Sequence, residues 1–152
     1  MLNYIMPAEW EKHSATWLAW PHDKVSFPNR VEKVEARFVE IIKALSESED
    51  VELIVLNKKM QTKAESLLQD AGINMSKVNF HITDYADIWT RDFGPAFIRD
   101  KKTKEIAWVK WDYNAYGNKF PSLLKDTQVF LNLRNVIDKR MLEPGLVMEN
   151  GS

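Results

Sequence analysis

Hydrophobic and polar residues follow two different periods along the first half of the chain. Short apolar or alternating runs are typical of strands, and apolar residues repeated every 3.6 positions with charges opposite are typical of amphipathic helices. The three strands are expected at 14–20, 51–56 and 78–83, and the two helices at 29–46 and 60–71. Asn29 is the expected N-cap of the first helix, and Gly72 the expected C-cap of the second. The order β-α-β-α-β favours an α/β fold with a mostly parallel sheet.

The second half has a different rhythm. Residues 95–99 and 105–111 flank a basic turn and predict a β-hairpin. A helical period follows over 127–139, and a last strand is expected at 145–149. No linker or low-complexity stretch separates the two halves, so we expect a single domain over 1–152.

Composition narrows the class of protein. The 152 residues are 45% hydrophobic and 28% charged, which excludes collagen-like, disulfide-scaffold and disordered chains. A net charge of −1 argues against nucleic acid as a partner. The sequence contains no cysteine. It also shows neither a signal peptide nor an apolar run of membrane-spanning length. These features predict a cytoplasmic protein without a membrane partner.

Tryptophan is unusually frequent, with six residues in the chain. A tryptophan buries about 150–250 Å² of surface, so we expect most of the six to lie in the core. The alternative is that some of them line a pocket for a cationic ligand, since an aromatic face attracts a cation.

The segment 84–95 is the richest in chemistry. It places Asp87, Trp89, Arg91 and Asp92 between two apolar strands, where α/β folds bind their ligands. An ionised aspartate beside an indole face suits a planar cation such as a guanidinium, whose paired N–H groups match a carboxylate. The alternative is an aspartate-capped loop with an ion pair from Arg91 to an aspartate, and the spacing does not decide between the two.

A second candidate segment, residues 112–121, contains Tyr113 and Tyr116. They could wall a pocket, or they could pack together in an aromatic turn rich in Asn, Gly and Pro. The three histidines lack the spacing of metal ligands, so we expect no metal site. Glu149 follows the last expected strand as a single acid.

Three ordered motifs make the sequence similar to the agmatine deiminase family, which also includes bacterial peptidyl-arginine deiminases. The motifs are Met-Pro-Ala-Glu-Trp and the Thr-Trp-Leu-Ala-Trp-Pro that follows within 6–21, Asp-Ile-Trp-Thr-Arg-Asp-Phe-Gly-Pro at 87–95, and Trp-Asp-Tyr-Asn-Ala-Tyr-Gly at 111–117. The final Glu-Asn-Gly-Ser resembles the family's Glu-Gly-Gly-Ser, with Asn150 in place of a glycine. Asparagine tolerates a positive φ, which makes this departure mild. The resemblance implies a pentein fold, an α/β propeller of five ββαβ units around a central channel.

The resemblance also implies an enzyme that hydrolyses a guanidinium to a ureido group and releases ammonia without a cofactor. By their place in the motifs, Trp89, Asp92 and Glu149 correspond to substrate-binding residues. Asp87, Arg91 and Tyr116 are further candidates for substrate binding, and for Asp87 and Arg91 a structural ion pair is the alternative. The family's cysteine nucleophile and its acid–base histidine are expected beyond Ser152, so this chain corresponds to about two of the five units and is expected to be inactive alone.

Three hypotheses follow from this comparison of motifs. The chain is the N-terminal portion of a deiminase, or a guanidinium-binding module without catalysis, or a structural domain that pairs with another chain, including a second copy, through an open propeller edge. The motifs favour agmatine as the substrate, with N-carbamoylputrescine as the product of a putrescine-synthesis step. The alternative is arginine or peptidyl-arginine, which would yield citrulline.

Overall fold

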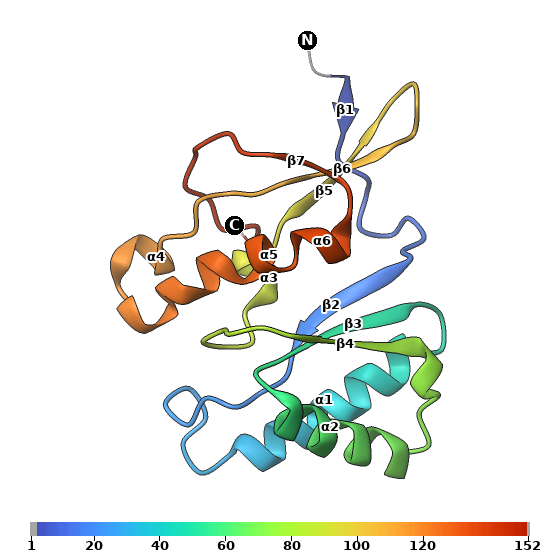
Figure 1. Cartoon of the computed structure of the whole chain (residues 1–152), viewed down its shortest axis with the longest axis vertical. Coiled ribbons are helices and arrows are strands. Elements are labelled where there is room, and N and C mark those ends of the chain that lie inside the picture. Colours follow the sequence, from blue (N-terminus) through green and yellow to red (C-terminus); the bar gives the residue numbers. More distant parts are fainter. Residues whose placement is uncertain (1–2, 152) are drawn as a thin grey trace. The chain divides into compact units, whose positions relative to one another are not determined.

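The computed structural model describes residues 3–151, and Figure 1 labels their elements. The chain divides into two compact units. One is His13–Thr90, and the other is built from the described residues before and after it. That 1–152 form one domain, equivalent to about two propeller units, stays a prediction. No helix in the described part of the chain is long and apolar enough to span a bilayer.

The unit His13–Thr90 is a parallel sheet with two helices on one face (Figure 1), as the periodicity predicts. Its sheet has the order β2-β3-β4. The elements are β2 (Ala15–Ala19), α1 (Val31–Leu45), β3 (Asp50–Val55), α2 (Lys58–Asp70), the 3-10 turn η1 (Met75–Lys77) and β4 (Val78–Ile82).

Only one of the two predicted helix caps in this unit is observed. The predicted Asn29 cap is wrong, because α1 has Arg30 as its N-cap and Asn29 lies in a turn with φ 56°. Asn57 caps α2 by accepting a hydrogen bond from the Met60 backbone N–H. Gly72 follows α2 with φ 74°, the left-handed conformation expected of a glycine that ends a helix.

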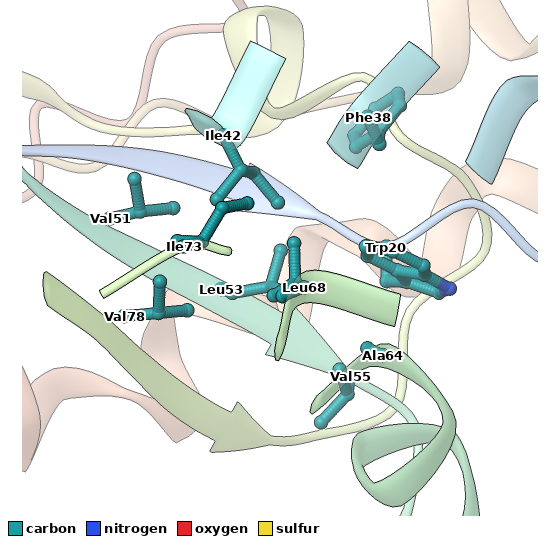
Figure 2. Close-up of a cluster of buried hydrophobic side chains, with 10 residues drawn as sticks. All are labelled: Trp20, Phe38, Ile42, Val51, Leu53, Val55, Ala64, Leu68, Ile73 and Val78. Atoms are coloured by element: carbon teal, nitrogen blue, oxygen red, sulfur yellow. The ribbon is translucent and has the colours of Figure 1, made fainter. Parts of the chain in front are cut away.

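One apolar cluster holds these helices on the sheet (Figure 2). Trp20 packs against the edge of Phe38 from α1, with ring centroids 6.4 Å apart. Leu53 of β3 and Leu68 of α2 are completely buried. Full burial of a leucine-sized side chain contributes about 1.5–3 kcal/mol, so this cluster is the main source of stability in the unit.

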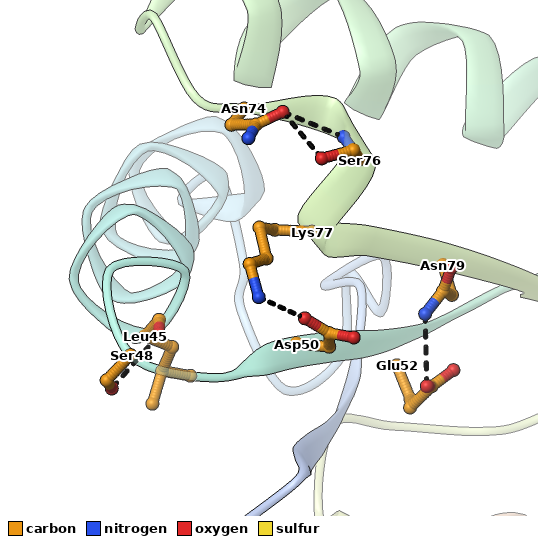
Figure 3. A network of polar contacts seen from close by, with 8 residues as sticks. All are labelled: Leu45, Ser48, Asp50, Glu52, Asn74, Ser76, Lys77 and Asn79. Atoms are coloured by element: carbon orange, nitrogen blue, oxygen red, sulfur yellow. Dashed lines mark hydrogen bonds and ion pairs between the residues drawn. The ribbon is translucent and has the colours of Figure 1, made fainter.

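Polar side chains fix the register of β3 against β4 at the strand ends (Figure 3). Lys77 reaches Asp50 over 2.7 Å, and the Asn79 amide donates to Glu52 over 3.1 Å. A slip of one residue would break both contacts and turn the buried side chains outward.

The other unit contains a four-stranded sheet in the order β1-β5-β6-β7. β5 and β6 form the predicted antiparallel hairpin, and β7 returns parallel to β6, so the order from β5 to β7 is ββαβ. The elements are β1 (Tyr4–Ile5), α3 (Thr90–Phe93), β5 (Ala96–Asp100), β6 (Ile106–Val109), α4 (Ala115–Asn118), the 3-10 segment η2 (Pro121–Gln128), α5 (Val129–Asn132), α6 (Arg134–Ile137) and β7 (Arg140–Leu142).

Two elements predicted for the second half are wrong. The helix expected over 127–139 is broken at Leu133, whose backbone leaves the helical region, and it ends at Asp138 with φ 45°. The strand expected at 145–149 is reduced to one bridge between Val147 and Asp112. The pattern misses β1 and β7 because strands of two and three residues are too short to show a period.

The expectation that most tryptophans are buried holds for only some of them. Trp20 and Trp108 are fully buried, whereas Trp10 is 90% exposed and Trp89 43% exposed. Trp17 and Trp111 are half-buried.

Candidate functional site

Asp92 lies on the short helix α3, and the hydroxyl of Tyr116 donates to its Oδ2 over 2.6 Å. The carboxylate is half-buried. A bond to an ionised oxygen is stronger than one between neutral groups, so Tyr116 holds the Asp92 carboxylate in one orientation. The two residues are 24 positions apart in the sequence, in two of the recognised motifs.

The segment after Glu149 packs against Asp92. The Asn150 N–H donates to the Asp92 carbonyl over 3.3 Å, and the Asn150 side chain donates to the Gly94 carbonyl. A Cβ on Gly151 would lie 2.5 Å from Asp92 Oδ1, closer than real Cβ atoms come, so a larger residue fits here only if the Asp92 carboxylate shifts. Asn150 does not have a positive φ, and its side chain serves as a hydrogen-bond donor.

The loop that carries Tyr116 has an unusual backbone. The four residues of α4 all have positive φ, from 53° at Ala115 to 72° at Gly117. An L-residue in this left-handed conformation costs about 1–2 kcal/mol. The Asn114 side chain offsets part of that cost by accepting the Gly117 N–H over 2.8 Å. Strain of this kind is found at functional sites, and here it directs the Tyr116 hydroxyl to Asp92.

The aromatic rings of this loop pack edge to face. Tyr116 has ring centroids 5.9 Å from Tyr113 on one side and 5.9 Å from Phe120 on the other. Of the two interpretations of segment 112–121, the aromatic-packed turn is therefore the one observed.

Besides burial, the charges of Asp92 and Glu149 both raise the pKa of the Tyr113 hydroxyl. Burial raises the pKa of Tyr113 to about 12, and the negative charges of Asp126, Asp92 and Glu149 add to the effect. Burial and the bond to Asp92 also raise the pKa of Tyr116. Both phenols stay neutral at physiological pH, and the carboxylates of Asp92 and Glu149 both act electrostatically on Tyr113.

Asp87 and Trp89 lie in the unit His13–Thr90 and bond to each other. The Trp89 indole N–H donates to Asp87 Oδ2 over 2.8 Å, and the Ile88 N–H donates to Oδ1, also over 2.8 Å. The loop is therefore capped by an aspartate, as one interpretation of the sequence holds. The predicted pairing of Arg91 with an aspartate is wrong, because Arg91 pairs with Glu9. Both partners are about two-thirds exposed, so this pair adds little stability.

Sequence reasoning missed three residues of these groups. Gly151 and Asn150 support Asp92, and Ser26 donates to Asp87 over 2.5 Å. The Glu-Asn-Gly-Ser motif contains a signal for the first two, since a glycine can mark a place where the backbone closely approaches another group. The Ser26 contact spans 61 positions and leaves no local signal.

Acidic and histidine side chains do not converge into a metal site within residues 3–151, where no three of them could hold one ion. His81 has a polar neighbour, with Nε2 2.5 Å from Glu52 Oε2.

Solved structures share this architecture. The chain superposes with a TM-score of 0.82 and 27% identity on a cysteine-to-serine variant of the agmatine deiminase of C. jejuni with substrate bound, covering 98% of this chain and 42% of that one. The agmatine deiminase of Enterococcus faecalis gives a TM-score of 0.84 at 24% identity, over 99% of this chain and 40% of that one. The fold is mixed α/β and is part of the pentein fold.

Sequence comparison gives the family. The profile of Porphyromonas-type peptidyl-arginine deiminases matches residues 5–152, and the chain belongs to that family. The agmatine deiminase of Ectopseudomonas mendocina is 33% identical over 158 residues, which cover 99% of this chain and 40% of that protein. The chain thus spans about 40% of the length of the curated relatives that it matches.

Proposed function

We propose that the complete gene product is a guanidine deiminase that acts on agmatine, and that Asp92 and Glu149 bind the guanidinium. The observation that carries the proposal is the support around Asp92. Tyr116 holds one carboxylate oxygen, and a glycine keeps the space beside the other free of a side chain. Family membership supports the same assignment.

The chemistry matches the residues. A guanidinium is a planar cation with N–H donors on every side, and carboxylates accept those donors in pairs. Hydrolysis adds water to the central carbon, breaks one C–N bond and releases ammonia, which leaves a ureido group. The reaction as the resemblance implies it needs a cysteine thiolate, and the 152 residues contain no cysteine. We therefore assign substrate binding to this chain, and the nucleophile and histidine to the part of the relatives' length that it does not span.

The remaining candidates have supporting roles in this proposal. Trp89 offers an aromatic face to the same class of ligand, and Tyr116 orients Asp92 by its hydrogen bond. Arg91 is a surface ion-pair residue, since it pairs with the exposed Glu9.

Agmatine is favoured because curated relatives over 99% of the chain are named agmatine deiminases. The product would be N-carbamoylputrescine, made for putrescine synthesis in the cytoplasm and without a cofactor. The family's own description favours the second candidate, peptidyl-arginine.

The test uses the complete gene product and measures ammonia released from agmatine, arginine and an arginine-containing peptide. We expect agmatine to be the best substrate. Asp92→Asn should lower kcat/KM by roughly 100-fold or more, because one charged contact to the reacting group is lost.

Asp138→Asn is the matched control, because it removes the same charge from an exposed position of the same unit where asparagine tolerates the positive φ. It should leave kcat/KM unchanged. Full activity of Asp92→Asn would reject Asp92 as a guanidinium ligand, and agmatine binding without ammonia release would favour a binding module.

A further inference from the structure

We propose that Asp87 is a positioning residue, whose buried carboxylate fixes the indole ring of Trp89 so that its exposed face is preset for a planar cation. The nature of that cation, a guanidinium, rests on the proposed function. The inference that Asp87 fixes the ring is independent of the proposed function. The inference changes the expected role of Asp87, which the motif alone left between substrate binding and an ion pair.

The contacts of Asp87 show that its carboxylate is occupied. Only 1% of the residue is exposed, and three donors reach its two oxygens. Oδ1 accepts the Ile88 N–H, while Oδ2 accepts the Trp89 indole N–H and contacts the Ser26 hydroxyl. With 1% of the residue exposed and three protein donors in place, this carboxylate has almost no surface left for a ligand. Asp87 is therefore suited to hold protein groups in place.

Trp89 is held at both its ring and its backbone. The indole has a single N–H donor, and that donor bonds to Asp87. The next residue, Thr90, donates its hydroxyl to the Trp17 carbonyl over 3.3 Å and its N–H to the Ile88 carbonyl over 2.7 Å. A ring that is 43% exposed would otherwise sample several rotamers. Fixing it in advance removes that entropic cost from binding.

Ser26 connects this arrangement to a second loop. Asp23 orders the loop by accepting the N–H groups of Val25 and Ser26, each over 3.0 Å. The Ser26 hydroxyl has one proton and lies between two carboxylate oxygens, Asp23 Oδ2 at 2.9 Å and Asp87 Oδ2 at 2.5 Å. Those bonds oppose the effect of burial, and the pKa of Asp23 is lowered overall. The loop thus holds the Ser26 hydroxyl against Asp87. Ser26 comes from a segment far before Asp87 in the sequence, whereas Trp89 lies just after Asp87 in the same loop.

The first experiment records indole ¹H–¹⁵N spectra of the complete gene product labelled at tryptophan. Trp89→Phe identifies the Trp89 signal by its loss. In Asp87→Asn the charged acceptor becomes neutral, so the Trp89 indole proton should move upfield and exchange faster with water. Asp70→Asn, an exposed change of the same charge in the same unit, should leave that signal in place. An unmoved signal in Asp87→Asn overturns the proposal.

Ser26→Ala guards against a failure of Asp87→Asn to fold. It removes one donor to the Asp87 carboxylate and leaves the aspartate itself intact. The Trp89 indole signal should then shift in the same direction as in Asp87→Asn, but by a smaller amount. Its proton should also exchange faster with water. No shift in a folded Ser26→Ala protein counts against the network.

The second experiment is a double-mutant cycle on agmatine turnover. Asp87→Asn and Trp89→Phe should each lower kcat/KM by up to roughly tenfold. The first frees the ring, and the second replaces the indole with a phenyl ring that attracts a cation less and has no N–H for Asp87. In the Trp89→Phe background, Asp87→Asn should cost nothing more, since it acts through the ring. Additive effects would show that Asp87 acts by itself, which overturns the proposal. If no guanidine compound is turned over, the proposed function fails, and the indole spectra still decide the role of Asp87.

Discussion

At the scale of single residues, two glycines are required for different physical reasons. Gly72 has φ 74° after α2, with open space where a Cβ would lie. Gly151 has an ordinary φ, but a Cβ there would collide with Asp92 Oδ1. The first glycine is needed for backbone conformation, and the second for space beside a carboxylate.

Alanine at these two positions should therefore separate stability from function. Gly151→Ala pushes the Asp92 carboxylate aside, and we expect kcat/KM on agmatine to fall by roughly 10- to 100-fold with little change in Tm. Gly72→Ala should lower the free energy of unfolding by about 1 kcal/mol and leave kcat/KM unchanged. Kinetics and thermal melts of both variants check this, and equal kinetics in the two would contradict the close approach of Gly151 to Asp92.

At the scale of elements, a charged pair joins the two helices of the unit His13–Thr90. Glu35 of α1 is only 5% exposed. It accepts the Trp20 indole N–H over 3.0 Å and the Lys63 ammonium of α2 over 2.6 and 2.7 Å. A buried carboxylate that loses its cation is costly, so the pair specifies how α1 lies against α2.

Lys63→Met should lower the free energy of unfolding by about 1–2 kcal/mol, because Glu35 keeps only the indole donor. The cost stays moderate because the Lys63 side chain is 53% exposed and water replaces part of the interaction. Lys59→Met, an exposed change on the same helix, should stay within about 0.5 kcal/mol of the parent. Urea unfolding measures both, and equal losses would mean that the pair is not stabilising.

At the scale of the whole molecule, charge and hydrogen bonding link pH to stability. Tyr113 and Tyr116 both have pKa values raised above the ordinary value of 10. The folded protein therefore keeps phenolic protons that the unfolded chain releases. Their contribution to stability is complete below about pH 10 and is lost as the pH rises toward the folded pKa values.

The free energy of unfolding should accordingly fall between pH 9 and pH 11. Tyr113→Phe should show a smaller fall over the same interval, because it removes one of the two phenols. Urea unfolding at the two pH values measures the difference, and absorbance at 295 nm follows phenol ionisation directly. A parent protein and a Tyr113→Phe variant with the same pH dependence would contradict the raised pKa of Tyr113.

The fold was predictable wherever a period runs over several residues. The strands β2, β3 and β4 and the β5–β6 hairpin follow from short apolar or alternating runs, and the helices between β2 and β4 follow from the 3.6-residue period. The prediction failed where local preference and tertiary contacts disagree. The 127–139 pattern is helical, yet the backbone breaks at Leu133, and the apolar run at 145–149 forms only one bridge.

Local patterns in the sequence specify the α/β class of this protein, the elements from β2 to β4, the β5–β6 hairpin and, through three motifs, the family. These properties reside in short-range patterns, which a chain carries before it folds. Three arrangements depend on how the elements pack: Tyr116 and Gly151 flank Asp92, Asp87 holds Trp89 together with Ser26, and Arg91 pairs with Glu9. Most of these contacts join residues tens of positions apart, and the burial of each partner and the direction of each side chain arise only when the elements pack.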